Sequence, residues 1–316
     1  MGAGRQRCAL FAGLLVAGCA GAPDSSPESG RFVFREDPEH GRVTILEGTE
    51  PVLTYNYGDQ LKEGAPEALT RSCYVHPIFG LDGEILTDDF PRDHLHHRGL
   101  SLMWPRLRAG SAAVDQWHLK GLRTIFEERV LARNTPDGAI LKLRNAWMLA
   151  DGTRVAREGL TLIVHPRDAV GRFVDVLYEI EPLGRDLFLQ GQVDKGYGGL
   201  NLRFAPRGDT RITTARGRLE SDSDHERFLW ADLSARFEDR EPFSGIAIQV
   251  QPDHLDTPPP PAWTLRHYGD LNVAWPGLET RSFDPGTILR LEYRLWIHRG
   301  DARSGQVAER LAAKPT

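Results

Sequence analysis

Apolar and polar residues alternate in short runs along most of this chain, whereas long stripes with helical 3.6-residue periodicity are scarce. Turn-forming residues separate these runs, as in Pro136-Asp137-Gly138, and this pattern is typical of antiparallel strands joined by short connections. The alternation predicts strands over residues 31–36, 42–47, 51–57, 71–79, 100–104, 124–132, 139–149, 154–165, 172–182, 187–194, 200–204, 228–237, 244–251, 272–274 and 288–298.

So many strands in a chain of 316 residues predict an all-β fold, arranged as one large β-sandwich over residues 31–316. A propeller would show a repeat of blade length, and the sequence has no such repeat. Residues 301–314 carry Ala and Leu on one side of a helical pattern, so a short helix is expected to close the chain.

The first residues differ in character from the rest. Residues 1–19 have a positive start with Arg5 and Arg7, and an apolar run too short to span a bilayer follows. The run ends in a lipobox-like Leu-Val-Ala-Gly-Cys, which predicts a lipoprotein signal peptide with lipidation at Cys19. The next residue is Ala rather than Asp, which favours the outer membrane. Residues 20–30 are polar and predict a flexible tether; an ordinary secretory signal is the alternative.

Composition excludes several function classes. The net charge of −5 is spread along the chain without a basic run, so nucleic acid is not an expected partner. The sequence has no phosphate-binding loop and no dinucleotide fingerprint, so no nucleotide cofactor is expected. After the predicted lipidation, Cys73 is the one thiol left in the domain, and a buried inert cysteine is the favoured interpretation.

The segment from Thr87 to Gly99 is the strongest candidate for a functional site, because His94, His96 and His97 lie there among aspartates and arginines. If the segment is extended, His94 and His96 point to one face. With His76 and Asp93 they form a candidate site for a divalent metal such as Zn, Mn, Fe or Ni.

Two other interpretations of the segment remain open. Metal-free catalysis would use His94, His96 and His97 to move protons near neutral pH, with Tyr197 in a Gly-rich loop completing the pair. A structural or binding-only cluster is the third possibility.

Other residues are candidates for substrate binding. Arg98 and Arg203 are expected to grip a carboxylate, for instance that of a uronic acid, unless they pair with internal aspartates. Trp117 offers an aromatic platform for a sugar ring, with packing as the alternative. The stretch His267-Tyr268-Gly269-Asp270 and His298 are weaker candidates.

Several separated segments together resemble the bacterial PmoA-like family over roughly residues 45 to 305. They are Cys73–Pro77, Gly83 with Leu86–Asp89, Asp93–Leu100, Asp115–Trp117, Lys195–Leu200 with Arg203, and Tyr293–Asp301. The resemblance implies an exported protein associated with carbohydrate metabolism and a galactose-mutarotase-like supersandwich. Methane oxidation is not inferred, because the chain lacks the apolar helices of a membrane oxygenase subunit.

The sequence thus predicts an exported, lipid-anchored protein of the bacterial envelope that acts on a carbohydrate or glycoside by lyase, hydrolase or epimerase chemistry. The alternative is a non-catalytic, glycan-binding surface lipoprotein.

Overall fold

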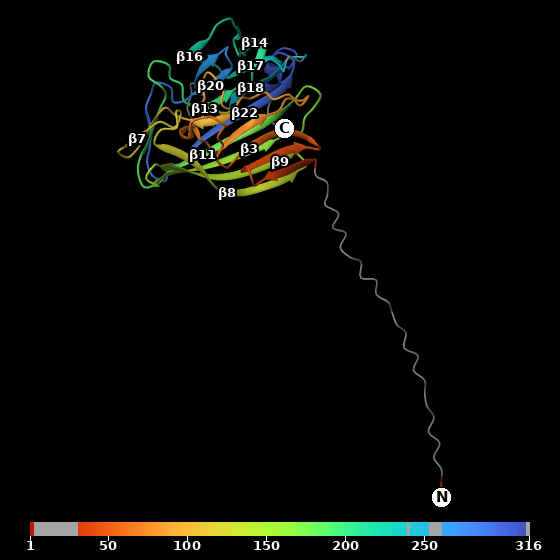
Figure 1. Cartoon of the computed structure of the whole chain (residues 1–316). Coiled ribbons are helices and arrows are strands. Elements are labelled where there is room, and N and C mark those ends of the chain that lie inside the picture. Colours follow the sequence, from red (N-terminus) through yellow and green to blue (C-terminus); the bar gives the residue numbers. More distant parts are fainter. Residues whose placement is uncertain (3–30, 239–240, 253–260, 314–316) are drawn as a thin grey trace.

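The computed structural model describes residues 1–2, 31–238, 241–252 and 261–313, and it contains three antiparallel sheets (Figure 1). The first sheet has nine strands in the order β1-β2-β3-β4-β5-β13-β20-β19-β16. These are β1 (Phe32–Asp37), β2 (Arg42–Glu47), β3 (Glu50–Asn56), β4 (Tyr74–Ile78), β5 (Leu100–Met103), β13 (Gly199–Arg203), β20 (Asp270–Ala274), β19 (Ala262–Arg266) and β16 (Ser223–Arg227).

The second sheet also has nine strands, in the order β15-β14-β17-β18-β22-β11-β10-β9-β8, and a small sheet has the order β21-β12-β6-β7. The second sheet contains β15 (Gly217–Leu219), β14 (Arg207–Thr214), β17 (Trp230–Phe237), β18 (Ser244–Val250), β22 (Leu289–Arg299), β11 (Gly171–Pro182), β10 (Arg154–Val164), β9 (Gly138–Leu149) and β8 (Leu122–Thr135). The small sheet contains β21 (Arg281–Phe283), β12 (Leu187–Gln190), β6 (Arg106–Ala109) and β7 (Ala112–Val114); a 3-10 turn (Glu67–Leu69) and helix α1 (Val307–Ala312) complete the described elements.

One hydrophobic cluster fills the space between the two large sheets and also reaches the small sheet. In β11, every second residue from Val174 to Ile180 is buried, and Leu100 and Leu102 of β5 lie in the same core from the other sheet. Because side chains alternate between faces along a strand, this spacing directs one face of each sheet inward. Each such side chain stabilises the fold by about 1.5–3 kcal/mol on burial.

The predicted all-β sandwich with a short C-terminal helix is confirmed. The helix spans Val307–Ala312 and is therefore shorter than predicted; Val307 and Leu311 pack it against Trp296 of β22. The strands that the sequence did not predict are mostly short or rich in charged residues: β6, β7, β14, β15, β16, β19 and β21.

The predicted signal peptide, Cys19 and the tether lie almost entirely outside the described residues. Among the helices that the structure describes, none has the length and apolar character needed to cross a membrane.

Candidate functional site

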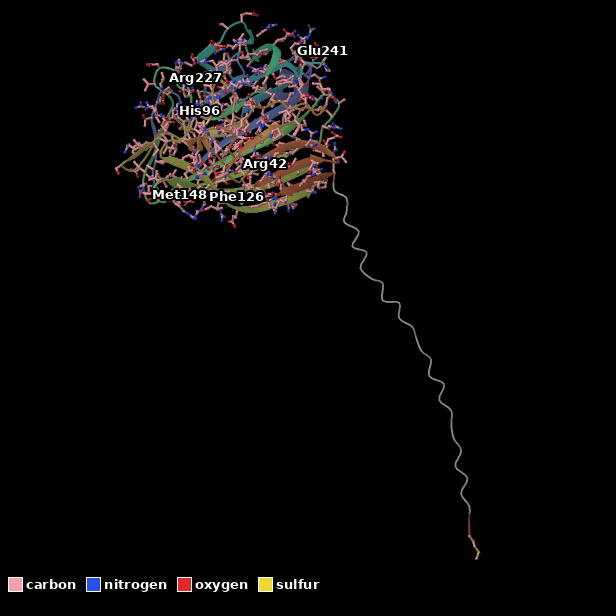
Figure 2. All side chains as sticks on the ribbon, in the orientation of Figure 1. Arg42, His96, Phe126, Met148, Arg227 and Glu241 are labelled. Atoms are coloured by element: carbon pink, nitrogen blue, oxygen red, sulfur yellow. The ribbon has the colours of Figure 1, made fainter. Side chains whose placement is uncertain are left out.

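Three neighbouring strands of the first sheet bring the candidate residues to one end of that sheet. Strand β13 pairs with β5 and β20, and the register places Leu202 opposite Leu100 and Arg203 opposite Asp270. The start of β5, the end of β13 and the start of β20 therefore lie side by side. The connection from β4 to β5 carries the histidine segment to this end; Figure 2 labels His96 there.

The faces of these strands that point away from the hydrophobic core carry a row of polar side chains, which other parts of the protein bury. Asn201 of β13 lies opposite Ser101 of β5 and Asn272 of β20, and Asn272 lies opposite Thr264 of β19. All four are buried, and Asn201 Nδ2 donates to Asp270 Oδ1 at 3.0 Å. The leucines between them face the core, so the period-2 alternation of these buried strands was a sequence signal for this row.

The three predicted histidines lie together, and a fourth joins them. The His94 ring stacks on His97 at 4.9 Å between centroids, and His96 meets the edge of His97 at 4.7 Å. His118, from the loop after β7, lies 4.6 Å from His96. The His94 ring also stacks on Tyr268 at 5.2 Å. Four imidazoles from two distant segments thus form one cluster.

Carboxylates accompany three of the four histidines. The atom pairs are His118 Nδ1 with Asp115 Oδ2 at 2.8 Å, His94 Nδ1 with Asp93 Oδ2 at 3.0 Å, and His97 Nδ1 with Asp270 Oδ1 at 3.4 Å. Only the His118–Asp115 contact is also a hydrogen bond, so Asp115 fixes the tautomer of His118 and leaves its other nitrogen to exchange a proton. Nδ1 of His94 and of His97 has no aligned hydrogen-bond partner in the described part of the chain. The first two pairs are partly exposed, whereas His97 and Asp270 are buried.

His96 has a different electrostatic environment from the other three. Burial, together with the neighbouring His97 and His118, lowers the pKa of His96 from 6.5 to about 2. His96 is therefore neutral at physiological pH, with one ring nitrogen as donor and the other as acceptor.

Arg203 anchors the outer side of the cluster. Its Nη2 donates to both oxygens of Asp93, at 2.6 and 2.8 Å. Burial acts to raise the pKa of Asp93, but the neighbouring Arg203 and His94 outweigh it and lower the pKa to about 2. Arg203 Nε and Nη1 are buried and make no hydrogen bond within the described part of the chain. Arg203 thus pairs with an internal aspartate, which the sequence left open as the alternative to ligand binding.

Arg98 is placed where it holds the histidine segment rather than where it reaches a ligand. Its side chain is fully buried, and it donates to the carbonyl oxygens of Leu95, His97 and Leu69 at 2.6 to 2.7 Å. Its guanidinium also lies 3.4 Å above the Phe90 ring. The guanidinium donors of Arg98 that were expected to bind a substrate carboxylate therefore bind main-chain carbonyls instead.

Trp117 and Tyr197 extend the cluster inward. Trp117 is buried and meets the edge of His97 at 5.4 Å, so it packs the site instead of offering an exposed platform. Tyr197 lies against Trp117 at 4.6 Å, and burial with the nearby Asp115 raises the pKa of its hydroxyl. The glycines beside Tyr197 serve packing: a Cβ on Gly199 would lie 2.7 Å from a carbonyl oxygen of β20.

The four predicted metal ligands do not fit a metal in this arrangement. His76 Nδ1 bonds to Thr87 Oγ1 at 3.0 Å, and Asp93 is engaged by Arg203. Within the described residues, no group of three or more His, Cys, Asp or Glu could hold a metal ion. We therefore derive no chemical step through a metal.

The weaker sequence candidates lie in two different parts of the fold. Tyr268 and Asp270 join the cluster, as described above. His298 lies in the second sheet, fully buried, with its Nε2 2.8 Å from Asp232 Oδ1. His118 and Asp115 flank Trp117 in the sequence; their i, i+3 spacing was the available signal for a paired imidazole.

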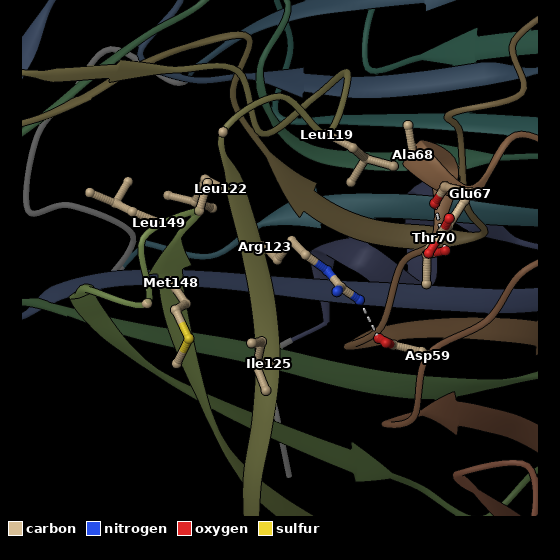
Figure 3. A pocket seen from close by; sticks show the side chains of 13 residues that line it. Asp59, Glu67, Ala68, Thr70, Leu119, Leu122, Arg123, Ile125, Met148 and Leu149 are labelled. Carbon is tan, nitrogen blue, oxygen red and sulfur yellow. Dashed lines mark hydrogen bonds and ion pairs between the residues drawn. The ribbon is translucent and has the colours of Figure 1, made fainter.

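Two pockets flank the loop from Asp115 to Gly121 that carries His118. One, of about 600 Å³, lies between this loop, the 3-10 turn and β8; an ion pair between Arg123 and Asp59, 2.6 Å long, crosses it (Figure 3). The other, of about 820 Å³, lies over the small sheet and includes Asp115 in its lining.

Comparison with known proteins assigns the family. A model described as "Family of unknown function (DUF6807)" matches residues 42–312, so the chain belongs to this family. The resemblance to the PmoA-like family was wrong. It rested on short separated segments, and none of them defines a family alone. The expectations of export and of a link to carbohydrate metabolism that rested on this resemblance are no longer supported by it.

The other comparisons add little. The search of curated proteins finds no match. Among solved structures, the chain is similar to a galactose mutarotase-like protein from Lactobacillus casei, with 9% identity, 84% of this chain and 100% of that chain covered, and a TM-score of 0.33. At this identity and TM-score we draw no function from the neighbour, and the supersandwich topology stays a prediction.

Proposed function

We propose that the protein binds a carbohydrate at the histidine cluster and acts on it by acid–base chemistry, as a lyase, hydrolase or epimerase. The observation that carries this proposal is the meeting of three His–carboxylate pairs around His96 at one end of a sheet. Reactions of these classes take a proton at one place on the sugar and deliver one at another.

The geometry supports a division of roles. Asp115 accepts from His118 Nδ1, which leaves Nε2 of this partly exposed ring to take or give the proton. His94, which contacts Asp93, lies 5.9 Å from His96 between centroids. His96, which is neutral, hydrogen-bonds a sugar hydroxyl. The raised pKa of Tyr197 keeps its hydroxyl protonated, so it serves as a donor.

Tyr268 provides the surface for binding a sugar ring. It is 41% exposed; its ring is stacked on His94, and the Arg203 guanidinium lies over the ring at 4.8 Å, so the exposed part of the ring is what remains for a ligand. Aromatic rings with one buried face and one exposed part are suited to pack against the apolar face of a sugar.

The test is an activity and binding screen of the purified protein on a panel of glycans and glycosides. His118→Ala is expected to abolish turnover on the active substrate while ligand affinity stays within about tenfold, because His118 moves the proton and adds little to binding. His40→Ala, at an exposed turn between β1 and β2, is the matched control and should behave as the wild type. No turnover on any glycan, with the largest affinity loss in Tyr268→Ala, would instead identify a glycan-binding protein.

We also propose that the chain is exported and anchored in the outer membrane through lipidated Cys19, because residues 1–19 have the order of a lipoprotein signal. Incorporation of labelled palmitate into the wild type, and none into Cys19→Ala, is the expected result. Labelling of both proteins would contradict it.

A further inference from the structure

The outward face of the small sheet forms a groove next to the histidine cluster. Along β6, Leu107 and Ala109 are buried whereas Arg106 and Arg108 are exposed, so both arginines point to the same outer face. On β12, Phe188 lies opposite Arg108 and Gln190 lies opposite Arg106. These side chains line the pocket of about 820 Å³, a size in the range of ligand sites.

The groove concentrates positive charge that the protein does not neutralise. Arg106, Arg108 and Lys120 line it, and in the described part of the chain none of them pairs with a carboxylate. Elsewhere on the surface arginines are commonly paired, as in Arg157 with Glu181 at 2.6 Å. The single carboxylate in the lining, Asp115, is already paired with His118.

The two arginines are held in place for binding. The Arg108 guanidinium lies 3.5 Å above the Phe188 ring, and its Nη1 donates to Gly110 O at 2.8 Å. Arg106 Nε donates to Gln190 Oε1 at 3.0 Å. Both guanidinium groups keep further N–H donors for a ligand, and a planar guanidinium already in position loses less freedom when it binds an oxyanion.

Asp115 connects this groove to the proposed reaction centre. The same carboxylate lines the groove and accepts from His118 Nδ1, and His118 lies 4.6 Å from His96. A sugar chain with one residue at the histidines would place a neighbouring residue over the small sheet.

We propose that this groove is a subsite for the anionic substituent of an acidic carbohydrate, a carboxylate or a sulfate ester, bound by Arg106, Arg108 and Lys120. The inference rests on the proposed function and names its substrate class. It also moves the recognition of the acid group away from Arg98, which donates to main-chain carbonyls, and from Arg203, whose charge is already paired with Asp93.

The test is isothermal titration of the full-length protein with three probes: oligogalacturonate trimers, the same trimers fully methyl-esterified, and a sulfated galactotriose. At least one of the two anionic probes should bind, the ester should bind at least about tenfold more weakly than the acid if the carboxylate is the ligand, and binding should weaken as salt rises. Preference for the sulfated probe over the uronate would assign a sulfate ester as the substituent.

Variants locate the subsite. Arg106→Gln and Arg108→Gln should each weaken binding of the preferred anionic probe by about tenfold or more, since each removes charge-assisted hydrogen bonds. Arg133→Gln, which removes an exposed positive charge on β8, should have no effect. Thermal unfolding of all variants checks that the fold is retained.

The outcomes separate the two proposals. Charge-independent binding that His96→Ala or Tyr268→Ala alters, but Arg106→Gln and Arg108→Gln do not, would overturn the anionic subsite and leave the proposed function in place. No binding of these probes, together with no binding or turnover in the glycan screen, would overturn both proposals. Failure of the acidic probes while neutral glycans bind would overturn the subsite alone.

Discussion

Replacing Arg98 by Ala should destabilise the protein strongly, because this side chain ties the histidine segment to the sheet. The fully buried guanidinium makes three hydrogen bonds to main-chain carbonyls and lies with its Nε 3.1 Å from Asp89 Oδ1. A charge-assisted hydrogen bond contributes about 1.5–3 kcal/mol, and these contributions are not additive. Asp89 keeps its bond from Tyr74 but loses its cation.

The expected loss is about 3–5 kcal/mol, the usual effect of breaking a buried ion pair on one side. At a urea m-value of about 3 kcal/mol per M, the unfolding midpoint would fall by about 1 to 2 M. Equilibrium urea unfolding, followed by tryptophan fluorescence, measures this change. Arg98→Lys keeps the charge without the planar fork, so it should recover only part of the loss.

Arg92→Ala is the matched control, since Arg92 is exposed in the same segment, and its expected effect is within about 0.5 kcal/mol. Hydrogen exchange adds a local readout: the His97 amide, which donates to His94 O at 2.8 Å, should lose protection in Arg98→Ala. If Arg98→Ala and Arg92→Ala unfold at the same urea concentration, the reasoning about this buried arginine is refuted.

Three further predictions follow from the site and the core. Burial raises the pKa of the Cys73 thiol to about 12, so iodoacetamide at pH 8 should label Cys73 in unfolded but not in native protein, as read by peptide mapping; rapid native labelling would be inconsistent with this burial. The native pKa of His96 lies below its unfolded value of 6.5, so below that pH the unfolded protein binds a proton that the folded protein does not. The free energy of unfolding of the wild type should therefore fall by up to about 2 kcal/mol between pH 7 and 5 because of this residue. His96→Gln should lose less over this range in urea unfolding, and equal slopes would disprove the assignment. Metal analysis of the purified protein should find no stoichiometric metal, because Thr87 and Arg203 engage His76 and Asp93 and the described residues hold no group of three or more possible ligands arranged for a metal; one equivalent that is lost in His94→Ala would contradict the arrangement.

The fold was predictable because the alternation of apolar and polar residues is a local property of each strand. It identified β9, β10, β11 and β22, whose inward residues build the core, almost to their ends. Strand β6 was not predicted because both of its outward positions are arginine, and a run of four residues with two charges is typical of a loop.

The site was predictable in part, for a related reason. The density of His and Asp around His96 was visible in the sequence, whereas its neighbours depend on the strand order of the first sheet. Nothing in the sequence shows that β13 lies between β5 and β20, and only that order brings Asp270 to His97. Arg98 looked available for a ligand because the sequence does not show that main-chain carbonyls surround it.

The contact between His97 and Asp270 joins residues separated by more than half of the chain. Contacts of such long range form late, because the loop between them must first be closed. During synthesis, Asp270 must leave the ribosome before this pair can form. A chain that ends before β20 therefore lacks the carboxylate beside His97, however much of the other sheet it has formed.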